Sequence, residues 1–240
     1  ENARLPVAER LDADDQWEVM TGNSIMKAGG LVKKAMDDGL QVCMAHAMLV
    51  KQEEGQFAMI AAGGRDAEHE ALADALAAWL IPACTADPDY PLLILCFAQE
   101  NTSNNYPWAI NQKAAGVTYV DYIKAYKRVC RIFDERCNTG LRVRNKANPT
   151  LHNPRIEFSF NCMYNWNGAH LEEAFPGLPL AASYQYNGHE LMDWDPIDWF
   201  SADLYDHTTN LTATNKAAVN TWLGTYVATR RGGHAGKATF

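Results

Sequence analysis

The sequence predicts an α/β fold in which helices cover a parallel sheet. Residues 92–97 (LLILCF) form an apolar run without polar alternation, which is typical of a strand buried on both faces. Strand-like and helix-like segments alternate along the chain with short connections, and this favours right-handed βαβ units. No internal repeat or low-complexity linker divides the chain. Residues 1–240 are therefore predicted to form one domain, with no element assigned in residues 1–39.

The first half of the chain predicts two strands and two helices. Residues 40–50 form a strand after a turn at residues 37–39, and residues 92–97 form the next strand. Between them, residues 66–80 have helical spacing, with acidic residues in the first turns that interact favourably with the helix dipole. Residues 117–136 form a long amphipathic helix.

The helix predicted at residues 117–136 has a start signal and an apolar stripe. Thr118 and Asp121 have the spacing of a capping pair. Apolar side chains at helical spacing predict the face that packs on the sheet, and they are Tyr122, Ile123, Tyr126, Val129, Cys130 and Phe133.

The second half of the chain continues the alternation. Residues 155–161 and 197–205 are predicted strands, and residues 215–230 are a predicted helix. After a glycine-rich break, residues 237–240 look like the beginning of another strand.

Composition excludes several classes of protein. The chain is 48% apolar and 21% charged, which is ordinary for a globular protein. A formal net charge of −8 disfavours a nucleic-acid partner. No apolar run approaches the roughly 18 residues that span a bilayer, so no membrane partner is expected. Without a CxxC pair, a Cys/His cluster or a phosphate-binding glycine loop, the sequence predicts neither a metal site nor a cofactor.

The six cysteines are widely scattered. Cys43, Cys96 and Cys162 lie in or beside apolar strand-like runs, where a buried free thiol is the expected state. Cys130 and Cys137 are close enough in sequence to meet across a helix end, and their pairing is left open.

The stretch from residue 91 to residue 108 carries the strongest functional signal. The apolar run ends shortly before a carboxylate, Glu100, and a polar loop then closes on Tyr106, Pro107 and Trp108. A carboxylate at the carboxyl end of a buried parallel strand is where α/β enzymes place their chemistry. Aromatic rings nearby offer flat faces to a ring-shaped ligand. The stretch predicts a sugar-cleaving or sugar-binding site.

Residues 99–108 (QENTSNNYPW) align without a gap with a motif like W-E-F-N-G-D-W-Y-P-W, whose Glu is the acid/base. In this the chain resembles family 26 glycoside hydrolases, the β-mannanase-like enzymes. Further matches follow in the family's order over roughly residues 40–240: residues 63–66 with its "G-x-Y-D" approach, Tyr122, Ile123 and Phe133 with its "YI…WR…F" helix, residues 158–161 with F-E-W-N, residues 175–177 with Y-P-G-D, and residues 198–206 with "VDWIGLDVYD".

The resemblance implies a (β/α)8 TIM barrel of the retaining glycoside hydrolase type, incomplete at the C-terminus because eight units need about 250 residues. It implies hydrolysis of a β-linked polysaccharide, mannan-like or an exopolysaccharide, by double displacement between two carboxyl groups about 5–5.5 Å apart. Glu100 would be the acid/base. The nucleophile would lie on a seventh strand, just past Phe240. An extracellular location is expected, because polymeric glycans rarely meet their hydrolases in the cytosol.

Five further residues are predicted to bind the substrate. Tyr106, Trp108 and Tyr205 can stack on sugar rings, or belong to the core at the rim of the sheet. Asn161 can hold a sugar hydroxyl or orient the acid/base, or make ordinary loop hydrogen bonds. Asp203 can line the site, where the family's strand supplies substrate contacts.

Departures from the family motif favour a second hypothesis. Cys96 stands where the family has an Arg four residues before the acid/base, and Gln99 stands where it has Trp or His. Together with the missing nucleophile, these changes predict a non-catalytic glycan-binding or structural subunit. Hydrolysis by the intact chain distinguishes the two hypotheses.

Overall fold

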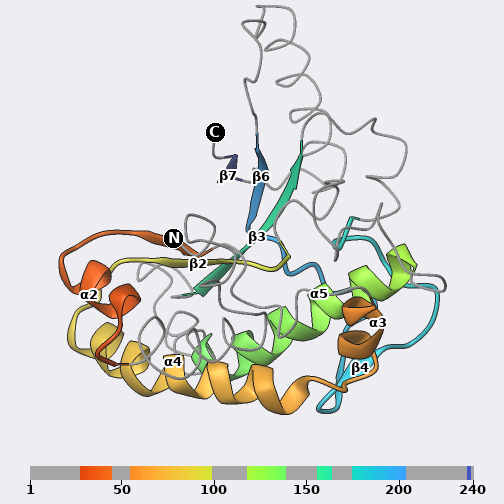
Figure 1. Ribbon diagram of the computed structural model, residues 1–240, viewed down its shortest axis with the longest axis horizontal. Coiled ribbons are helices and arrows are strands. Elements are labelled where there is room, and N and C mark those ends of the chain that lie inside the picture. Colours follow the sequence, from red (N-terminus) through yellow and green to blue (C-terminus); the bar gives the residue numbers. More distant parts are fainter. Residues whose placement is uncertain are drawn as a thin grey trace, which may run out of the picture.

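A computed structural model places a parallel sheet against two long helices (Figure 1). It describes residues 28–44, 55–98, 118–138, 156–163, 175–203 and 237–238.

The main sheet has five strands that lie side by side in chain order, and every neighbouring pair is parallel. A smaller antiparallel pair lies apart from it. The strands of the main sheet are β1 (Val42–Met44), β2 (Leu93–Cys96), β3 (Ile156–Met163), β6 (Trp199–Asp203) and β7 (Lys237–Ala238), and the pair consists of β4 (Gln185–Tyr186) and β5 (His189–Glu190).

The predicted (β/α)8 barrel is wrong for this structure. The described residues form an open row in which β1 and β7 are the end strands, and eight strands closing on themselves are not seen among them. The expectation failed because sequence motifs report on single strand–helix units. Strand number and closure depend instead on pairing between strands far apart in the chain, which no local pattern encodes.

The described helices are α2 (Leu31–Asp37), α3 (Gln56–Ala61), α4 (Asp66–Ala86) and α5 (Tyr119–Phe133), which continues as the π-helical turn η5 (Asp134–Asn138). The predicted capping pair of α5 is confirmed. The amide of Asp121 donates to Thr118 Oγ1 at 3.2 Å, and the amide of Thr118 donates to Asp121 Oδ2 at 2.8 Å. Helix α4 continues six residues past the predicted end at Leu80. The predicted helix at residues 215–230 lies outside the described residues.

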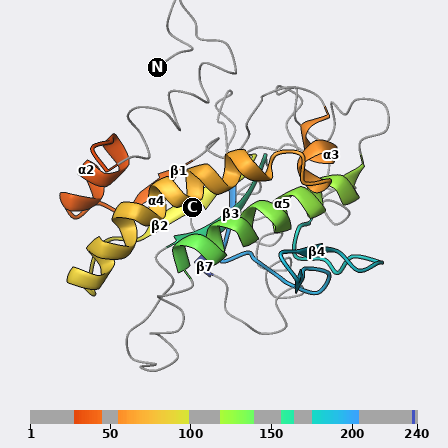
Figure 2. The same cartoon turned by 90° about the horizontal axis from the view of Figure 1, so that it is seen from below.

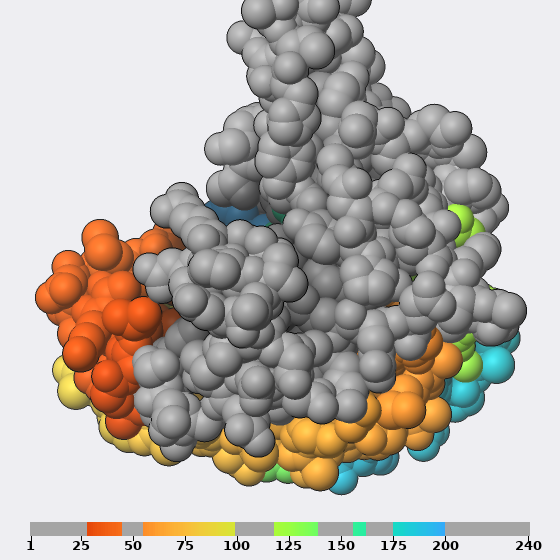
Figure 3. Space-filling model, in the orientation of Figure 1, coloured from red at the N-terminus to blue at the C-terminus, as the bar shows by residue number. Residues whose placement is uncertain are grey.

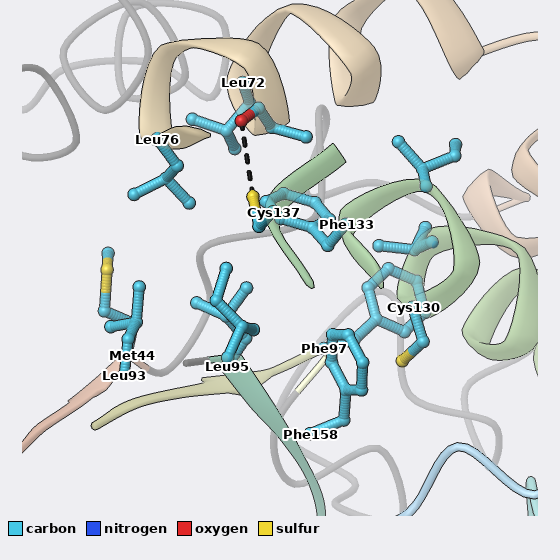
Figure 4. Packing of buried hydrophobic residues seen from close by; sticks show 14 of the residues in the cluster. Met44, Leu72, Leu76, Leu93, Leu95, Phe97, Cys130, Phe133, Cys137 and Phe158 are labelled. Carbon is cyan, nitrogen blue, oxygen red and sulfur yellow. Dashed lines mark hydrogen bonds between the residues drawn. The ribbon is translucent and has the colours of Figure 1, made fainter. Parts of the chain in front are cut away.

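The core lies between the sheet and the α4–α5 pair (Figures 1 and 4). The whole predicted stripe of α5 is buried. Alternate strand residues face these helices, as the period of a strand requires. In β2 and the residue after it they are Leu93, Leu95 and Phe97, and in β3 they are Ile156, Phe158 and Phe160. Figure 4 shows Leu72 and Leu76 of α4 above the β2 side chains.

Ion pairs join α4 to α5, which run side by side beneath the sheet (Figure 2). Arg128 of α5 pairs with Asp66, and Arg136 of η5 pairs with Glu70 and Asp74. The three carboxylates are spaced four residues apart on α4, so they form one row on its surface.

Helix α5 also buries a lysine under the segment that carries β4 and β5. Lys127 is 0% exposed, and its Nζ donates to the carbonyl oxygens of Leu191 at 3.1 Å and Met192 at 2.7 Å. Burial lowers the pKa of Lys127 to about 8, against the opposing attraction of Asp195 and the carboxylates near it.

The cysteines differ in part from expectation. Cys96 is buried and forms no disulfide, as predicted, whereas Cys43 is exposed on strand β1. Cys130 and Cys137 are both free, and the thiol of Cys137 donates to the carbonyl of Ala73 at 3.4 Å (Figure 4). Cys162 lies on β3, but its side chain is outside the described part.

The amino-terminal described segment, residues 28–44, lies at the surface on one side of the molecule (Figure 3). Two of its leucines are exposed, Leu31 by 66% and Leu40 by 58%. Among the described helices none is both long and apolar enough to cross a membrane.

Candidate functional site

Of the predicted site residues, Asn161 is described in full and Asp203 by its backbone. Glu100, Tyr106, Trp108 and Tyr205 lie outside the described residues. The part of the site that can be built from the structure is therefore the edge of the sheet at the carboxyl ends of β2, β3 and β6.

The register of the sheet brings the two described candidates to this edge. Cys96, the last residue of β2, pairs with Ser159, and Asn161 follows Ser159 by two residues along β3. On the next strand, Asn161 pairs with Ser201 and Met163 pairs with Asp203. Asn161 and Asp203 therefore lie on neighbouring strands, two register positions apart. Ligand sites in open parallel sheets lie outside this edge.

Strand β2 is buried within a parallel sheet, as the sequence predicts. All four of its residues are buried, and it pairs in parallel with β1 on one side and β3 on the other. A strand with neighbours on both sides and apolar packing has little freedom to move. It therefore fixes the place of Phe97 and Ala98, the two described residues that follow it.

That following chain begins with an unusual backbone conformation. Ala98, the second residue after β2, has φ = +48° and is 0% exposed. In the left-handed region Cβ approaches the next carbonyl oxygen, which costs a non-glycine residue about 1–2 kcal/mol. Nothing in the sequence signals this conformation, because Ala has no preference for it.

The sheet face opposite α4 and α5 carries buried polar groups. On β3 these are Glu157, Ser159 and Asn161, which are 5%, 4% and 7% exposed. Ile94 and Cys96 of β2 lie on the same face and are buried too. Polar side chains buried along one face of a central strand are costly unless partnered, so hydrogen-bond partners are expected for this row.

Glu157 is partnered within this row. The indole Nε1 of Trp199 on β6 donates a hydrogen bond to Glu157 Oε2. Glu157 pairs in register with Ile94 and precedes Asn161 by four residues, about 13 Å along the strand. It therefore lies towards the amino end of β3. A carboxylate there is too far from the Asn161 edge for a catalytic pair, whose members lie about 5–5.5 Å apart.

Two hydrogen-bonded anchors align β3 with its neighbours. Asn138, at the end of η5, donates to the carbonyl of Ile156 at 3.0 Å and accepts from its amide at 3.2 Å. Asp198, just before β6, donates its amide to the carbonyl of Phe158 at 2.9 Å and accepts from the Phe158 amide at 3.0 Å. These contacts set the register that brings Asn161 and Asp203 to one edge.

Sequence reasoning missed Ala98, Glu157 and Trp199. The first gives no sequence signal, whereas the alternation of Glu157, Ser159 and Asn161 with apolar residues was visible in residues 155–161. In the described part of the chain, no three His, Cys, Asp or Glu side chains gather closely enough to hold a metal ion.

No protein-family model matches this chain, and no curated protein matches it.

Proposed function

We propose that the chain is a glycoside hydrolase of a β-linked polysaccharide, mannan-like or an exopolysaccharide, related to the family 26 enzymes. The observation that carries the proposal is the position of Glu100 in the sequence. It follows by four residues the end of a strand that is fully buried and has parallel neighbours on both sides. A carboxylate at such a strand end is typical of α/β active sites.

In the proposed retaining mechanism, Glu100 donates its proton to the glycosidic oxygen as a second carboxylate attacks the anomeric carbon. The leaving sugar departs with that proton. The ionised Glu100 then takes a proton from water, whose oxygen attacks the anomeric carbon and releases the second carboxylate. Glu157 is not proposed as that second group, because it lies about 13 Å along β3 from Asn161.

Substrate contacts are proposed for the residues around the same edge. Asn161 carries an amide that can bond a sugar hydroxyl, and its burial on the polar face of β3 supports this role. Asp203, two register positions further on β6, is proposed to contact the substrate. Tyr106, Trp108 and Tyr205 are proposed to stack on sugar rings. Because a polymeric substrate does not cross membranes, an extracellular location goes with this proposal.

A specific observation favours a second function. Cys96, which takes the place of the family's Arg, is 3% exposed and provides no positive charge on the polar face of β2. A non-catalytic glycan-binding or structural subunit would tolerate that loss more readily than an enzyme would.

The deciding experiment uses the intact chain and a panel of β-mannans, β-glucans and bacterial exopolysaccharides, with release of reducing ends as the readout. We expect hydrolysis of at least one polymer, with the first product formed in the β-configuration by NMR. Glu100→Gln should abolish it, since general acid–base groups contribute about 10²–10⁴-fold. Glu68→Gln, a substitution of the same kind on α4, should leave it unchanged.

Unchanged turnover in Glu100→Gln would overturn the assignment of Glu100. Binding of a polymer by the intact chain without any turnover would replace the enzyme with the glycan-binding subunit.

A further inference from the structure

The tip of the β4–β5 hairpin joins an asparagine to a glycine in an exposed turn. Asn187 has φ = +50° and Gly188 has φ = +80°, and Tyr186 pairs with His189 across them. Two consecutive left-handed residues between paired strands are typical of the type I′ turn, which favours Asn-Gly. Both turn residues are exposed. Water therefore reaches the side chain and the backbone at the tip.

The Asn187-Gly188 pair carries its own nucleophile and electrophile. A five-membered ring forms when the backbone nitrogen of Gly188 attacks Cγ of Asn187. A side chain on the residue after the asparagine hinders this attack, and Gly188 has none. The turn selects glycine for its positive φ and not for lack of space, since an added Cβ would meet no atom within 4 Å. The residue that the turn requires thus leaves the attacking nitrogen unshielded.

Ring closure converts the amide to a carboxylate, with water as the only co-reactant. The Gly188 nitrogen gives its proton to hydroxide and bonds to Cγ of Asn187. The Cγ–Nδ2 bond breaks and releases ammonia, which takes its proton from water. Water then adds to either carbonyl carbon of the succinimide and breaks that carbon's bond to the ring nitrogen. The product is aspartate or isoaspartate, and the chain gains one negative charge.

A carboxylate lies beside the group that changes. Nδ2 of Asn187 donates to Oε2 of Glu135 at 3.2 Å. The other carboxylate oxygen, Oε1, lies 2.8 Å from Nε of Arg131 and 3.5 Å from Nε2 of His189. When the donor becomes a carboxylate, a hydrogen bond is replaced by a contact between two negative charges.

The arginines at this end of α5 are already paired. Nη1 of Arg131 also lies 3.6 Å from Oδ2 of Asp134. The guanidinium of Arg136 lies 2.8 Å from a carboxylate oxygen of Glu70 and 2.6 Å from one of Asp74. The new negative charge therefore enters a place where carboxylates already bind the described arginines.

We propose that Asn187 is a deamidation site, and that its conversion to aspartate or isoaspartate loosens the hairpin from α5 and η5. The reaction needs no enzyme, and its rate rises with pH because hydroxide removes the Gly188 proton. The hydrogen bond to Glu135 restrains the amide, so conversion in the folded chain is slower than in a free peptide. The hairpin keeps a second contact, the hydrogen bond from the Tyr186 hydroxyl to Glu70 at 2.7 Å, so the effect is local.

The first test follows the reaction itself. The folded chain and a synthetic peptide of residues 183–192 are incubated at alkaline pH, and peptide mapping by mass spectrometry locates the conversion. Mapping is needed because the chain has a second Asn-Gly pair at residues 167–168. We expect Asn187 to convert in both, more slowly in the folded chain. Asn187→Gln, whose longer side chain would need a six-membered ring, should stay unmodified. A folded chain in which Asn187 remains intact after the peptide has converted would overturn the proposed site.

The second test measures the consequence. Asn187→Asp reproduces one product, and hydrogen exchange of residues 184–191 reports on the hairpin, where the Leu191 amide donates to the carbonyl of Tyr184 at 2.8 Å. We expect protection factors to fall about two- to fivefold, the range for one exposed charge contact. In a Glu135→Gln background the repulsion is absent, and the same substitution should change protection less than about twofold. Unchanged protection, or an equal fall in both backgrounds, would show that the new charge does not loosen the hairpin through Glu135.

Discussion

Arg128 binds Asp66 through two parallel hydrogen bonds, with Nε 2.7 Å from Oδ1 and Nη2 2.6 Å from Oδ2. Asp66 is the first residue of α4, and Arg128 lies in the middle of α5. The same guanidinium lies 5.1 Å from the centre of the Tyr186 ring on β4. The hydrogen bonds to Asp66 raise the pKa of Arg128 further above its usual range. This one arginine therefore ties two helices and the β4–β5 hairpin together beneath the sheet.

Arg128→Lys should destabilise the protein by about 1–2 kcal/mol, because an ammonium cannot reproduce the planar two-point contact. Urea unfolding followed by circular dichroism measures the change. Lys33→Gln is the control. It removes an ion pair with Asp37 on α2, whose side chains are 26% and 46% exposed, and should cost less than about 0.5 kcal/mol. Equal effects of the two substitutions would contradict the prediction.

Gly63→Ala should also destabilise, for two separable reasons. Gly63 has φ = +84°, and an added Cβ would lie 2.7 Å from Nη2 of Arg128. The backbone part costs about 1–2 kcal/mol and the steric part adds to it. In an Arg128→Ala background the clash with the guanidinium is gone, and the backbone part and a tight contact with Asp66 Oδ2 at 3.2 Å remain, so the cost of Gly63→Ala should be smaller there. A double-mutant cycle that closes within about 0.3 kcal/mol would show that the two residues do not interact.

Lys127 should make stability rise with pH on the alkaline side. Its folded pKa is about 8, below the value of about 10.4 in an unfolded chain. Below pH 8 both states carry the proton, and the folded state bears the full cost of a buried charge. Between about pH 8 and pH 10.4 the unfolded state binds more protons than the folded state, so the free energy of unfolding increases. The total is at most about 3 kcal/mol.

Lys127→Met isolates this effect, since other groups titrate equally in both proteins. We expect the free energy of unfolding of the wild type, minus that of the variant, to increase between pH 8 and pH 10. Urea titrations at four pH values measure it. If the free energies of unfolding of the wild type and the variant run parallel across this pH range, the pKa of Lys127 is not lowered in the folded protein.

Glu190 should make the stability of the protein depend on pH in the acid range. Its carboxylate accepts hydrogen bonds from the Ser183 hydroxyl and from the amides of Tyr184 and Met192, and these lower its pKa to about 2. Because the pKa of Glu190 is lower in the folded than in the unfolded state, its ionised carboxylate stabilises the protein at pH values above about 4.5. This contribution disappears as the pH falls from about 4.5 to about 2. Glu190→Gln should melt at a lower temperature than the wild type at pH 6, and the difference should shrink at pH 2.5. A difference that is independent of pH would refute this role.

Elements with a complete local signal were predicted well. Helix α5 carries its capping box and its apolar stripe within one stretch of chain, and β2 is a pure apolar run. The β4–β5 hairpin also had a signal, Asn187-Gly188, which demands a tight turn, but it was not recognised.

Features that depend on distant partners were not predicted. The burial of Lys127 arises because the carbonyls of Leu191 and Met192, more than 60 residues away, fold over α5. By helical spacing Lys127 lies beside the stripe residues Ile123 and Cys130, but a lysine at that position gives no signal of burial. Likewise, Glu157 looks like an ordinary strand residue until Trp199 on β6 donates to it.

The sequence by itself determined the strand within residues 92–97, the capped and striped helix that begins after Thr118, and the carboxylate that follows the buried run. Those choices depend on the apolar period and the caps, which are written within a few residues of each other. Tertiary structure alone decided that the described strands form an open row, that Asn161 and Asp203 share one edge of it, and that Ala98 is left-handed. Each of these is set by pairing or packing between segments distant in the chain, which can override the local preference of any single residue.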